Sequence, residues 1–323
     1  MSYSFLRESK LYIVCGGNKY RIYTSSAITF NQTFAEDSYS VKTLHDQSKM
    51  FEGSNITTAN PANFSFDVPL TIEKDESIMI DLLGDLVATS DSDIETQQLK
   101  SFDIYVQTGK SIFNLENAII SSASFDFVPH NQFTVRLEGQ GTKLSRVANY
   151  NGTNWRNIAD NANYTIPGSA QSESSTRTPL LIYPVLTFDS LNMNNIISVN
   201  LQLQNEIQWT DFETLHNSLS VTNSSNAMFP STYTLGKRIV SGAIQQYQTD
   251  NNITQFDDFS TNTDLTIKAV QVGKASNATP FFQIQLNPVS YTARVQTGDV
   301  YAQSYDFMST QNTAVSTQIT QYS

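Results

Sequence analysis

The stretch Thr43-Leu44-His45, followed by Met50-Phe51, occurs a second time in this chain as Thr214-Leu215-His216, followed by Met228-Phe229. The gap between its two parts is four residues in the first copy and eleven in the second. A duplication keeps the order of its elements while the loops between them change length, so similar pairs should flank this one. The stretch therefore predicts a chain of two related halves.

Three further pairs follow the same order. They are residues 28–30 (ITF) with 199–201 (VNL), residues 106–110 (VQTGK) with 270–274 (VQVGK), and residues 133–137 (FTVRL) with 291–295 (YTARV). The offset within a pair drifts from 171 to 178, then to 164 and 158, as insertions and deletions between fixed elements would produce. Chance matching in a chain rich in Asn, Ser and Thr is the alternative to a duplication.

Length and composition indicate two domains built from strands. A chain of 323 residues can form two domains that each bury a core. Only 15% of the residues are charged, while Asn, Gln, Ser, Thr, Tyr and Phe are abundant, which suits strands better than helices. We expect an all-β fold with a first domain at 1–146, a linker or long loop at 147–178, a second domain at 179–310 and a flexible tail at 311–323.

The charge is acidic in both halves. The net charge is −11, with 12 basic and 18 acidic side chains in residues 1–150 and 7 and 12 in residues 151–323. No basic patch supports nucleic-acid binding through phosphate neutralisation, and an acidic surface repels a polyanion. We expect no stable binding of nucleic acid.

Candidate catalytic and metal-binding residues are few. Cys15 is the only cysteine, and the three histidines (His45, His130 and His216) lack ligand spacing. Asp81 and Asp85 lie a turn apart on an expected helix, where a solvated face explains them better than acid–base chemistry or a metal. Asp257-Asp258 is typical of a loop. We expect no enzymatic activity, no metal and no cofactor.

Nothing at the N-terminus has the pattern of a signal peptide, and no apolar run is long enough to span a membrane. We therefore expect no membrane segment and synthesis in the cytoplasm of the host cell.

The first half predicts a β-hairpin, a long excursion and one helix. Residues 10–14 and 20–23 are β-rich and separated by Gly16-Gly17-Asn18-Lys19, a hairpin signal. Residues 27–34 alternate as a third strand, residues 35–62 lack sustained periodicity, and residues 63–72 alternate again. In residues 78–86 apolar side chains follow helical spacing after an acidic start, which predicts an amphipathic helix.

The remaining chain predicts further strands. In the first half these are residues 99–106, 121–127 and 132–137, and in the second half residues 180–186, 198–209, 240–247, 265–272, 281–286 and 290–295. Residues 253–259 occupy the place of the first-half helix. The tail after Met308, rich in Gln, Ser and Thr, is expected to be mobile or held by a neighbour.

This order of elements resembles the major tail tube protein of long-tailed bacteriophages. The resemblance rests on the hairpin, the long loop carrying Leu44-His45 to Phe51, the strand, the short helix and the paired strands. Residues 121–141, which end in Arg136-Leu137-Glu138-Gly139-Gln140-Gly141, are similar to the closing hairpin of that family. The likeness covers most of residues 10–145 and, more weakly, residues 180–310.

The resemblance implies tandem β-sandwich domains, each with a short flanking helix, that contribute strands to a β-barrel lumen. It implies trimeric rings with pseudo-sixfold symmetry that stack into a hollow tail tube, the conduit for DNA ejection. Residues 35–62 and 205–239 would be the stacking loops. The candidate ring-stacking residues are Leu44, His45, Met50, Phe51, Leu215, His216, Met228 and Phe229, and the candidate closing-strand positions are Phe133, Arg136, Tyr291 and Arg294.

The same resemblance implies a virion location and a set of partners. These are further copies of the chain, a tape-measure protein inside the tube, a tail terminator and baseplate or tip proteins at its ends, and a sheath in a contractile tail, with DNA passing transiently. The second half departs from the family pattern, because its helix is weak and its loop is longer and holds Lys237-Arg238. Equivalent stacking by both halves is therefore left open.

Three alternatives stay open. A baseplate or tube-initiating ring would have the same features as a repeating tube protein. A carbohydrate-binding or adhesive tail-tip module would use exposed aromatic rings, for which Trp155 and Trp209 are candidates, although Trp209 in a strand favours a core position. A glycoside hydrolase would need two carboxylates at a set separation, and no pair stands out.

Overall fold

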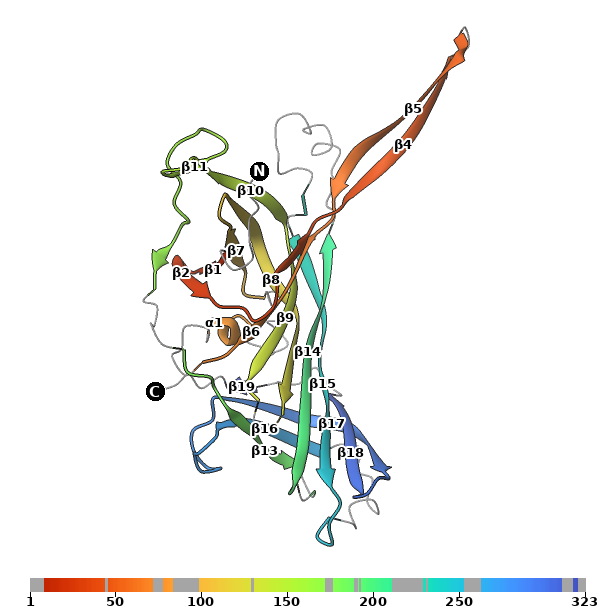
Figure 1. Ribbon diagram of the computed structural model, residues 1–323. Helices are drawn as coiled ribbons and strands as arrows, with labels where there is room; N and C mark the ends of the chain where they lie inside the picture. Colours follow the sequence, from red (N-terminus) through yellow and green to blue (C-terminus); the bar gives the residue numbers. More distant parts are fainter. Residues whose placement is uncertain are drawn as a thin grey trace, which may run out of the picture.

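The computed structural model describes residues 9–43, 46–71, 78–83, 99–128, 131–171, 177–188, 191, 193–210, 229–230, 232–252, 263–309 and 316–318. Strands dominate these ranges, and the helix within them is the single turn α1 (Ile78–Asp81) (Figure 1). The expected all-β fold is confirmed. Met79, Leu82 and Leu83 are buried, as the amphipathic pattern predicts, whereas the second expected helix at 253–259 lies outside the described residues.

The N-terminal hairpin forms as predicted. β1 (Lys10–Cys15) and β2 (Asn18–Ile22) pair antiparallel around Gly16 and Gly17, whose φ angles are 57° and 79°. Two successive positive φ values are the requirement of the tightest hairpin turn, and glycine meets it without strain.

The first half of the chain forms two β-layers. One layer holds β2, β1, β7 (Phe102–Gln107) and the first part of β8 (Ser111–Phe127). The other holds β3 (Thr29–Asn31), β6 (Ala62–Pro69), β9 (Thr134–Gly141) and the second part of β8. β8 therefore passes from one layer to the other, and the buried aromatic side chains Phe64, Phe66 and Phe102 pack between the layers.

The second half repeats this arrangement with longer strands. One layer holds β13 (Ile182–Phe188), β16 (Thr263–Gln271) and the first part of β17 (Phe282–Gln296). The other holds β14 (Ile196–Thr210), β15 (Thr232–Tyr247), β18 (Ala302–Ser309) and the second part of β17. β17 is one continuous strand where the sequence predicts two, because the same strand serves both layers.

The two halves are joined edge to edge. The second part of β8 pairs antiparallel with β14, and Phe125 lies opposite Leu201. The result is a layer of eight strands in the order β3-β6-β9-β8-β14-β15-β18-β17 that does not close into a barrel. One hydrophobic cluster extends through both halves, so the halves share a core.

Most of the strand pairings of one half recur in the other. β1 pairs with β7 as β13 pairs with β16, and β3 with β6 as β14 with β15. The pairs β6–β9, β7–β8 and β8–β9 correspond in the same way to β15–β18, β16–β17 and β17–β18. These pairings match β9 with β18. Residues 133–137 lie in and before β9, whereas residues 291–295 lie in β17. This sequence pair of the expected repeat is therefore not on corresponding strands.

The expected long loop at 35–62 is instead a regular hairpin. β4 (Phe34–Thr43) and β5 (Asp46–Ala59) form a two-stranded sheet of their own that projects far from the body of the molecule (Figure 1). The sequence prediction missed these strands because residues 35–62 show no sustained alternation. Among the described strands, β4 and β5 pair only with each other.

The expected linker at 147–178 is in large part structured. It contains the end of β10 (Lys143–Tyr150), together with β11 (Trp155–Asn157) and β12 (Ser169–Ala170). Buried Tyr105, Ile112 and Ala148 form a second small core with this segment. Part of the expected flexible tail is also ordered, because β19 (Ser316–Gln318) pairs with β17.

Candidate functional site

The candidate site is the face of the eight-stranded layer that points away from the core. We call it the polar face and define it by the exposed positions of the strand alternation, such as Ser65 and Ser124 beside buried Phe66 and Phe125. Alternation in a strand sends successive side chains to opposite faces, so the apolar positions that build the core oblige the others to form this surface. Its uncharged members include Thr29, Asn31, Asn63, Ser65, Ser122, Ser124, Asn200, Gln202, Ser241, Gln245, Thr292 and Gln296.

Both arginines of the polar face are paired with acids on the same face. Arg136 approaches Glu138 with both Nε and Nη2 at 3.1 Å from Oε1. Arg294 Nη2 lies 3.0 Å from Asp306 Oδ2, and Asn200 Nδ2 donates to Asp126 Oδ1. Exposed pairs of this kind add little stability, but they leave few uncompensated cations for a phosphate backbone.

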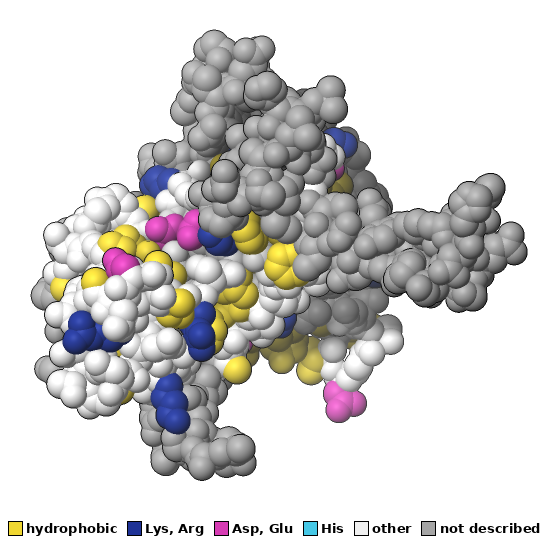
Figure 2. Space-filling model, turned by 90° about the horizontal axis from the view of Figure 1, so that it is seen from above, with side chains coloured by type: hydrophobic (Ala, Val, Ile, Leu, Met, Phe, Trp, Pro, Cys, Tyr) yellow, Lys and Arg dark blue, Asp and Glu magenta, His cyan; other side chains and the backbone are white. Residues whose placement is uncertain are grey.

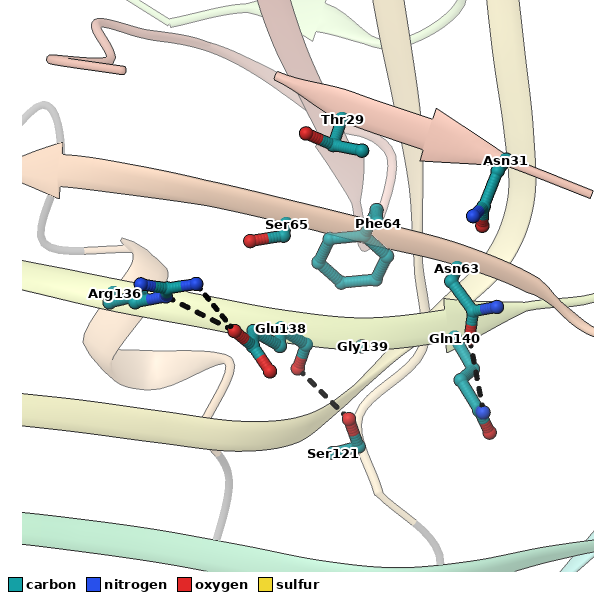
Figure 3. Close-up of a pocket in the computed structure, with 10 residues that line it drawn as sticks. All are labelled: Thr29, Asn31, Asn63, Phe64, Ser65, Ser121, Arg136, Glu138, Gly139 and Gln140. Atoms are coloured by element: carbon teal, nitrogen blue, oxygen red, sulfur yellow. Dashed lines mark hydrogen bonds and ion pairs between the residues drawn. The ribbon is translucent and has the colours of Figure 1, made fainter. Parts of the chain in front are cut away.

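A hollow of about 460 Å³ on the polar face is lined by residues of β3, β6, β8 and β9. Figure 3 shows Arg136 and Glu138 paired beside it, with Ser121 Oγ donating to the Glu138 carbonyl at 3.2 Å. Gln140 Nε2 donates to Asn63 Oδ1 at 3.2 Å. The side chains bond to one another, and within the described residues no group of His, Cys, Asp and Glu is arranged to hold a metal.

The predicted stacking residues lie mostly beyond the described part of the chain. Leu44, His45, Leu215, His216 and Met228 fall outside it. Met50 and Phe51 lie on β5 of the projecting hairpin. Phe229 is half-buried, with Lys143 Nζ 5.2 Å from its ring centroid.

The predicted closing-strand residues divide between core and surface. Phe133 is buried against Phe125 and Phe127, and Tyr291 packs against Phe188 and Tyr305. Arg136 and Arg294 lie on the polar face with their acidic partners. Sequence reasoning did not assign this face, although its signal is the Ser, Asn, Gln and Thr that alternate with apolar residues in β14 and β15.

The two tryptophans are half-buried, and each contacts other side chains. Trp155 lies 5.2 Å from Tyr150, ring to ring, and packs on the second small core. Trp209 Nε1 donates to Gln140 Oε1 at 2.8 Å, and its ring lies 5.4 Å from that of Tyr233.

The surface seen from above carries Lys and Arg side chains at separate points rather than in one patch (Figure 2). No helix in the described part of the chain is long and apolar enough to cross a membrane.

An open layer of corresponding strands with a polar face is what a subunit of a hollow assembly requires, and comparison with known families agrees. Residues 1–322 match the model of the Bacteriophage Baseplate Tube Protein Family. The chain belongs to this family. No curated protein matches the sequence.

Membership makes the chain a structural protein of a phage tail or baseplate tube and a virion component. The resemblance to phage tube proteins is thereby confirmed at the level of the tube. The family is that of the baseplate tube, which was one of the alternatives, and does not identify the chain as the major tail tube protein.

Proposed function

We propose that this baseplate tube protein assembles into rings in which the polar face lines a central channel for DNA. The observation that carries the proposal is the open layer of eight strands, built by two sets of corresponding pairings and polar on one face. A duplicated subunit supplies two similar sectors, so three copies give a ring with pseudo-sixfold symmetry. A trimer of duplicated subunits has six similar sectors and so matches the symmetry of a sixfold tube.

The channel wall in this arrangement suits passage of DNA. The described acids of the face (Asp67, Asp126, Glu138, Glu206 and Asp306) outnumber its cations, which are Arg136, Lys237 and Arg294. Because strong DNA binding depends on cationic groups that release counterions from phosphates, a wall on which acids outnumber cations holds DNA weakly. The protein acts here as a conduit, and we propose no enzymatic activity and no cofactor.

Stacking of rings is assigned to one end of the molecule. The hairpin β4–β5 projects from the same end at which β14 finishes and β15 begins (Figure 1). In a ring, the hairpin would then point along the tube axis toward the next layer. We propose that the hairpin makes the main contact with that layer, and that baseplate or tip proteins, a terminator, a tape-measure protein and a sheath meet the tube at its ends, inside and outside.

Negative-stain electron microscopy of the purified protein tests the proposal, at rising concentration and at several salt concentrations. Rings with a central channel are the expected result, and their symmetry can be counted in class averages. Limited stacks would favour a baseplate ring, whereas long tubes would favour a repeating tube protein. Compact monomers that bind a glycan array would instead favour the adhesive module.

A deletion separates ring formation from stacking. Removing residues 38–54 shortens β4 and β5 without touching the eight-stranded layer. We expect the variant to form single rings that do not stack. Loss of the rings themselves would contradict the assignment of the hairpin to stacking.

A further inference from the structure

The eight-stranded layer ends in two strand edges that have no partner among the described residues. One is the outer edge of β3, which pairs only with β6. The other is the end of β17, residues 292–296, whose strand partner in the described part of the chain is β18. An unpaired edge exposes backbone donors and acceptors and is a template for another strand.

The molecule already contains one joint of the kind that these edges could make. Where the halves meet, the second part of β8 pairs with β14, with Phe125 opposite Leu201 and Asp126 opposite Asn200. Phe125 and Leu201 are 1% and 0% exposed, so the joint is sealed by an apolar pair on the core side. On the polar face, Asn200 Nδ2 donates to Asp126 Oδ1 across it.

The strand pairings show which residues at the free edges correspond to this joint. Phe30 pairs with Phe64, and Phe64 with Gly139. Leu201 pairs with Gly242, and Gly242 with Phe307. Following the same path across three strands therefore matches Phe30 with Leu201, and Gly139 with Phe307.

The same path leads to the partner of β3. Val135 lies four residues before Gly139 and pairs with Phe125. Gln303 lies four residues before Phe307 and pairs with Val295. Val295 thus corresponds to Phe125. The sequence repeat gives the same matches. The offset of 171 at residues 28–30 matches Phe30 with Leu201, and the offset of 178 at Met50-Phe51 matches Phe64 with Gly242.

We propose that β17 of one copy pairs antiparallel with β3 of a second copy, in the register that places Val295 opposite Phe30. The flanking pairs are Gln296 with Thr29 and Arg294 with Asn31. The inference rests on the proposed ring, and it specifies the contact that closes it.

Exposure of the residues agrees with this joint. Val295 is 46% exposed although its counterpart Phe125 is buried. Phe30 is half-buried and already packs against the main core at the other edge of the layer. Pairing the two edges would cover Val295 with an aromatic ring and satisfy both rows of backbone groups, as the internal joint does.

Disulfide trapping tests the register. In a Cys15→Ser background, Thr29→Cys with Gln296→Cys places two thiols directly opposite one another across the proposed joint. Opposed residues of an antiparallel pair have Cα atoms about 4.5 to 5.5 Å apart, within the range of a disulfide. We expect oxidation to give interchain bonds and a ladder on a non-reducing gel that ends at the ring size.

Two control variants calibrate the trap. Thr29→Cys with Arg294→Cys uses the same face but is displaced by two residues, to diagonal separations of about 7 to 8 Å, and should not crosslink. Asp126→Cys with Asn200→Cys occupies the corresponding place in the internal joint and should form an intrachain bond. Electron microscopy of each sample reports whether rings are present.

A charge variant provides a second measurement. Val295→Lys should abolish rings while leaving the monomer folded, since the site is exposed, whereas Val300→Lys, at a side chain that is 59% exposed and outside the joint, should leave the rings intact. Rings that crosslink only through the displaced pair, or survive Val295→Lys, would overturn the register and leave the proposed ring standing. Absence of both rings and interchain bonds would overturn both proposals.

Discussion

The two halves of the molecule place different chemistry on corresponding strands. In the first half Val68, Val135 and Leu137 are buried on β6 and β9. The positions that the pairings match to them in the second half are Gln246, Gln303 and Tyr305, which are also fully buried. One half thus has an apolar core where the other has a polar one.

The polar core is held together by hydrogen bonds. Gln246 Nε2 donates to Gln303 Oε1 at 3.1 Å, and the Tyr305 hydroxyl donates to the same oxygen at 2.8 Å. Gln303 Nε2 donates to the Asn252 carbonyl at 3.3 Å, and Asn252 Nδ2 donates to the Tyr247 carbonyl at 3.0 Å. Burying these groups is tolerated because each finds a partner, which also fixes the geometry of the network.

A second difference is an exchange of aromatic ring and glycine. In the first half the ring is Phe64 on β6 and the glycine is Gly139 on β9, directly opposite. In the second half the glycine, Gly242, is on β15 and the ring, Phe307, is on β18. The comparison teaches that the backbone ladder is kept while either strand can supply the ring, provided that the other leaves room for it.

The largest effect on stability is expected from adding a side chain at Gly139 or Gly242, where the opposing aromatic ring needs the space. A methyl group at Gly139 would lie 2.2 Å from the Ile119 carbonyl oxygen, and one at Gly242 would lie 2.1 Å from that of Asn200. Backbone atoms must move to accommodate either, so Gly139→Ala and Gly242→Ala should each cost about 3 kcal/mol of unfolding free energy. Urea unfolding measures the loss. Gly298→Ala, whose nearest neighbour would be 3.6 Å away, is the control and should change stability little.

A smaller effect is expected from breaking the polar core. Gln303→Leu removes the acceptor shared by Gln246 and Tyr305 and should cost about 2 kcal/mol, because buried donors are left unpaired. Gln303→Leu combined with Gln246→Leu and Tyr305→Phe removes the donors as well. The triple variant should therefore lose less than the sum of the three single losses in urea unfolding. Simple additivity would show that the network does not act as a unit.

The smallest effect concerns alkaline stability. Burial, together with the neighbouring Tyr164, raises the pKa of Tyr105 in the first half, and burial raises the pKa of Tyr305 in the second. The folded state holds these protons more tightly than the unfolded state, so the stabilisation is complete below the ordinary tyrosine pKa and declines as pH rises above about 10. The midpoint temperature of thermal unfolding should decrease as pH rises above about 10. For Tyr105→Phe this temperature should decrease less steeply than for the parent protein. An unchanged slope would mean that Tyr105 does not contribute.

Much of the fold could be predicted from local patterns. The hairpin around Gly16 and Gly17 follows from two adjacent glycines between β-rich runs, and the buried face of β6 follows from Phe64, Phe66 and Val68. Strands β10, β11, β12, β18 and β19, and the first part of β8, were not predicted. β11, β12 and β19 are two or three residues long, too short to show alternation, and β12 pairs with β2, which is distant in sequence.

The candidate site was harder to predict than the strands. Arg136 and Arg294 were singled out, but only as closing-strand positions, and their acidic partners were not identified. Glu138 lies two residues away on the same strand as its partner, whereas Asp306 is on the next strand. A face of a sheet consists of residues from many strands, and the order of those strands in the sheet cannot be predicted from local sequence patterns.

The sequence alone indicated the all-β fold class and led to the hypothesis of two similar halves. Its alternation, low charge and repeated stretch depend on interactions within a strand or a turn, which are local. Only the tertiary structure decided that β8 and β17 each serve two layers, that the 35–62 segment is a hairpin, and that β8 meets β14. These features depend on which strand edges find one another, and edge pairing is made by backbone groups that every sequence carries.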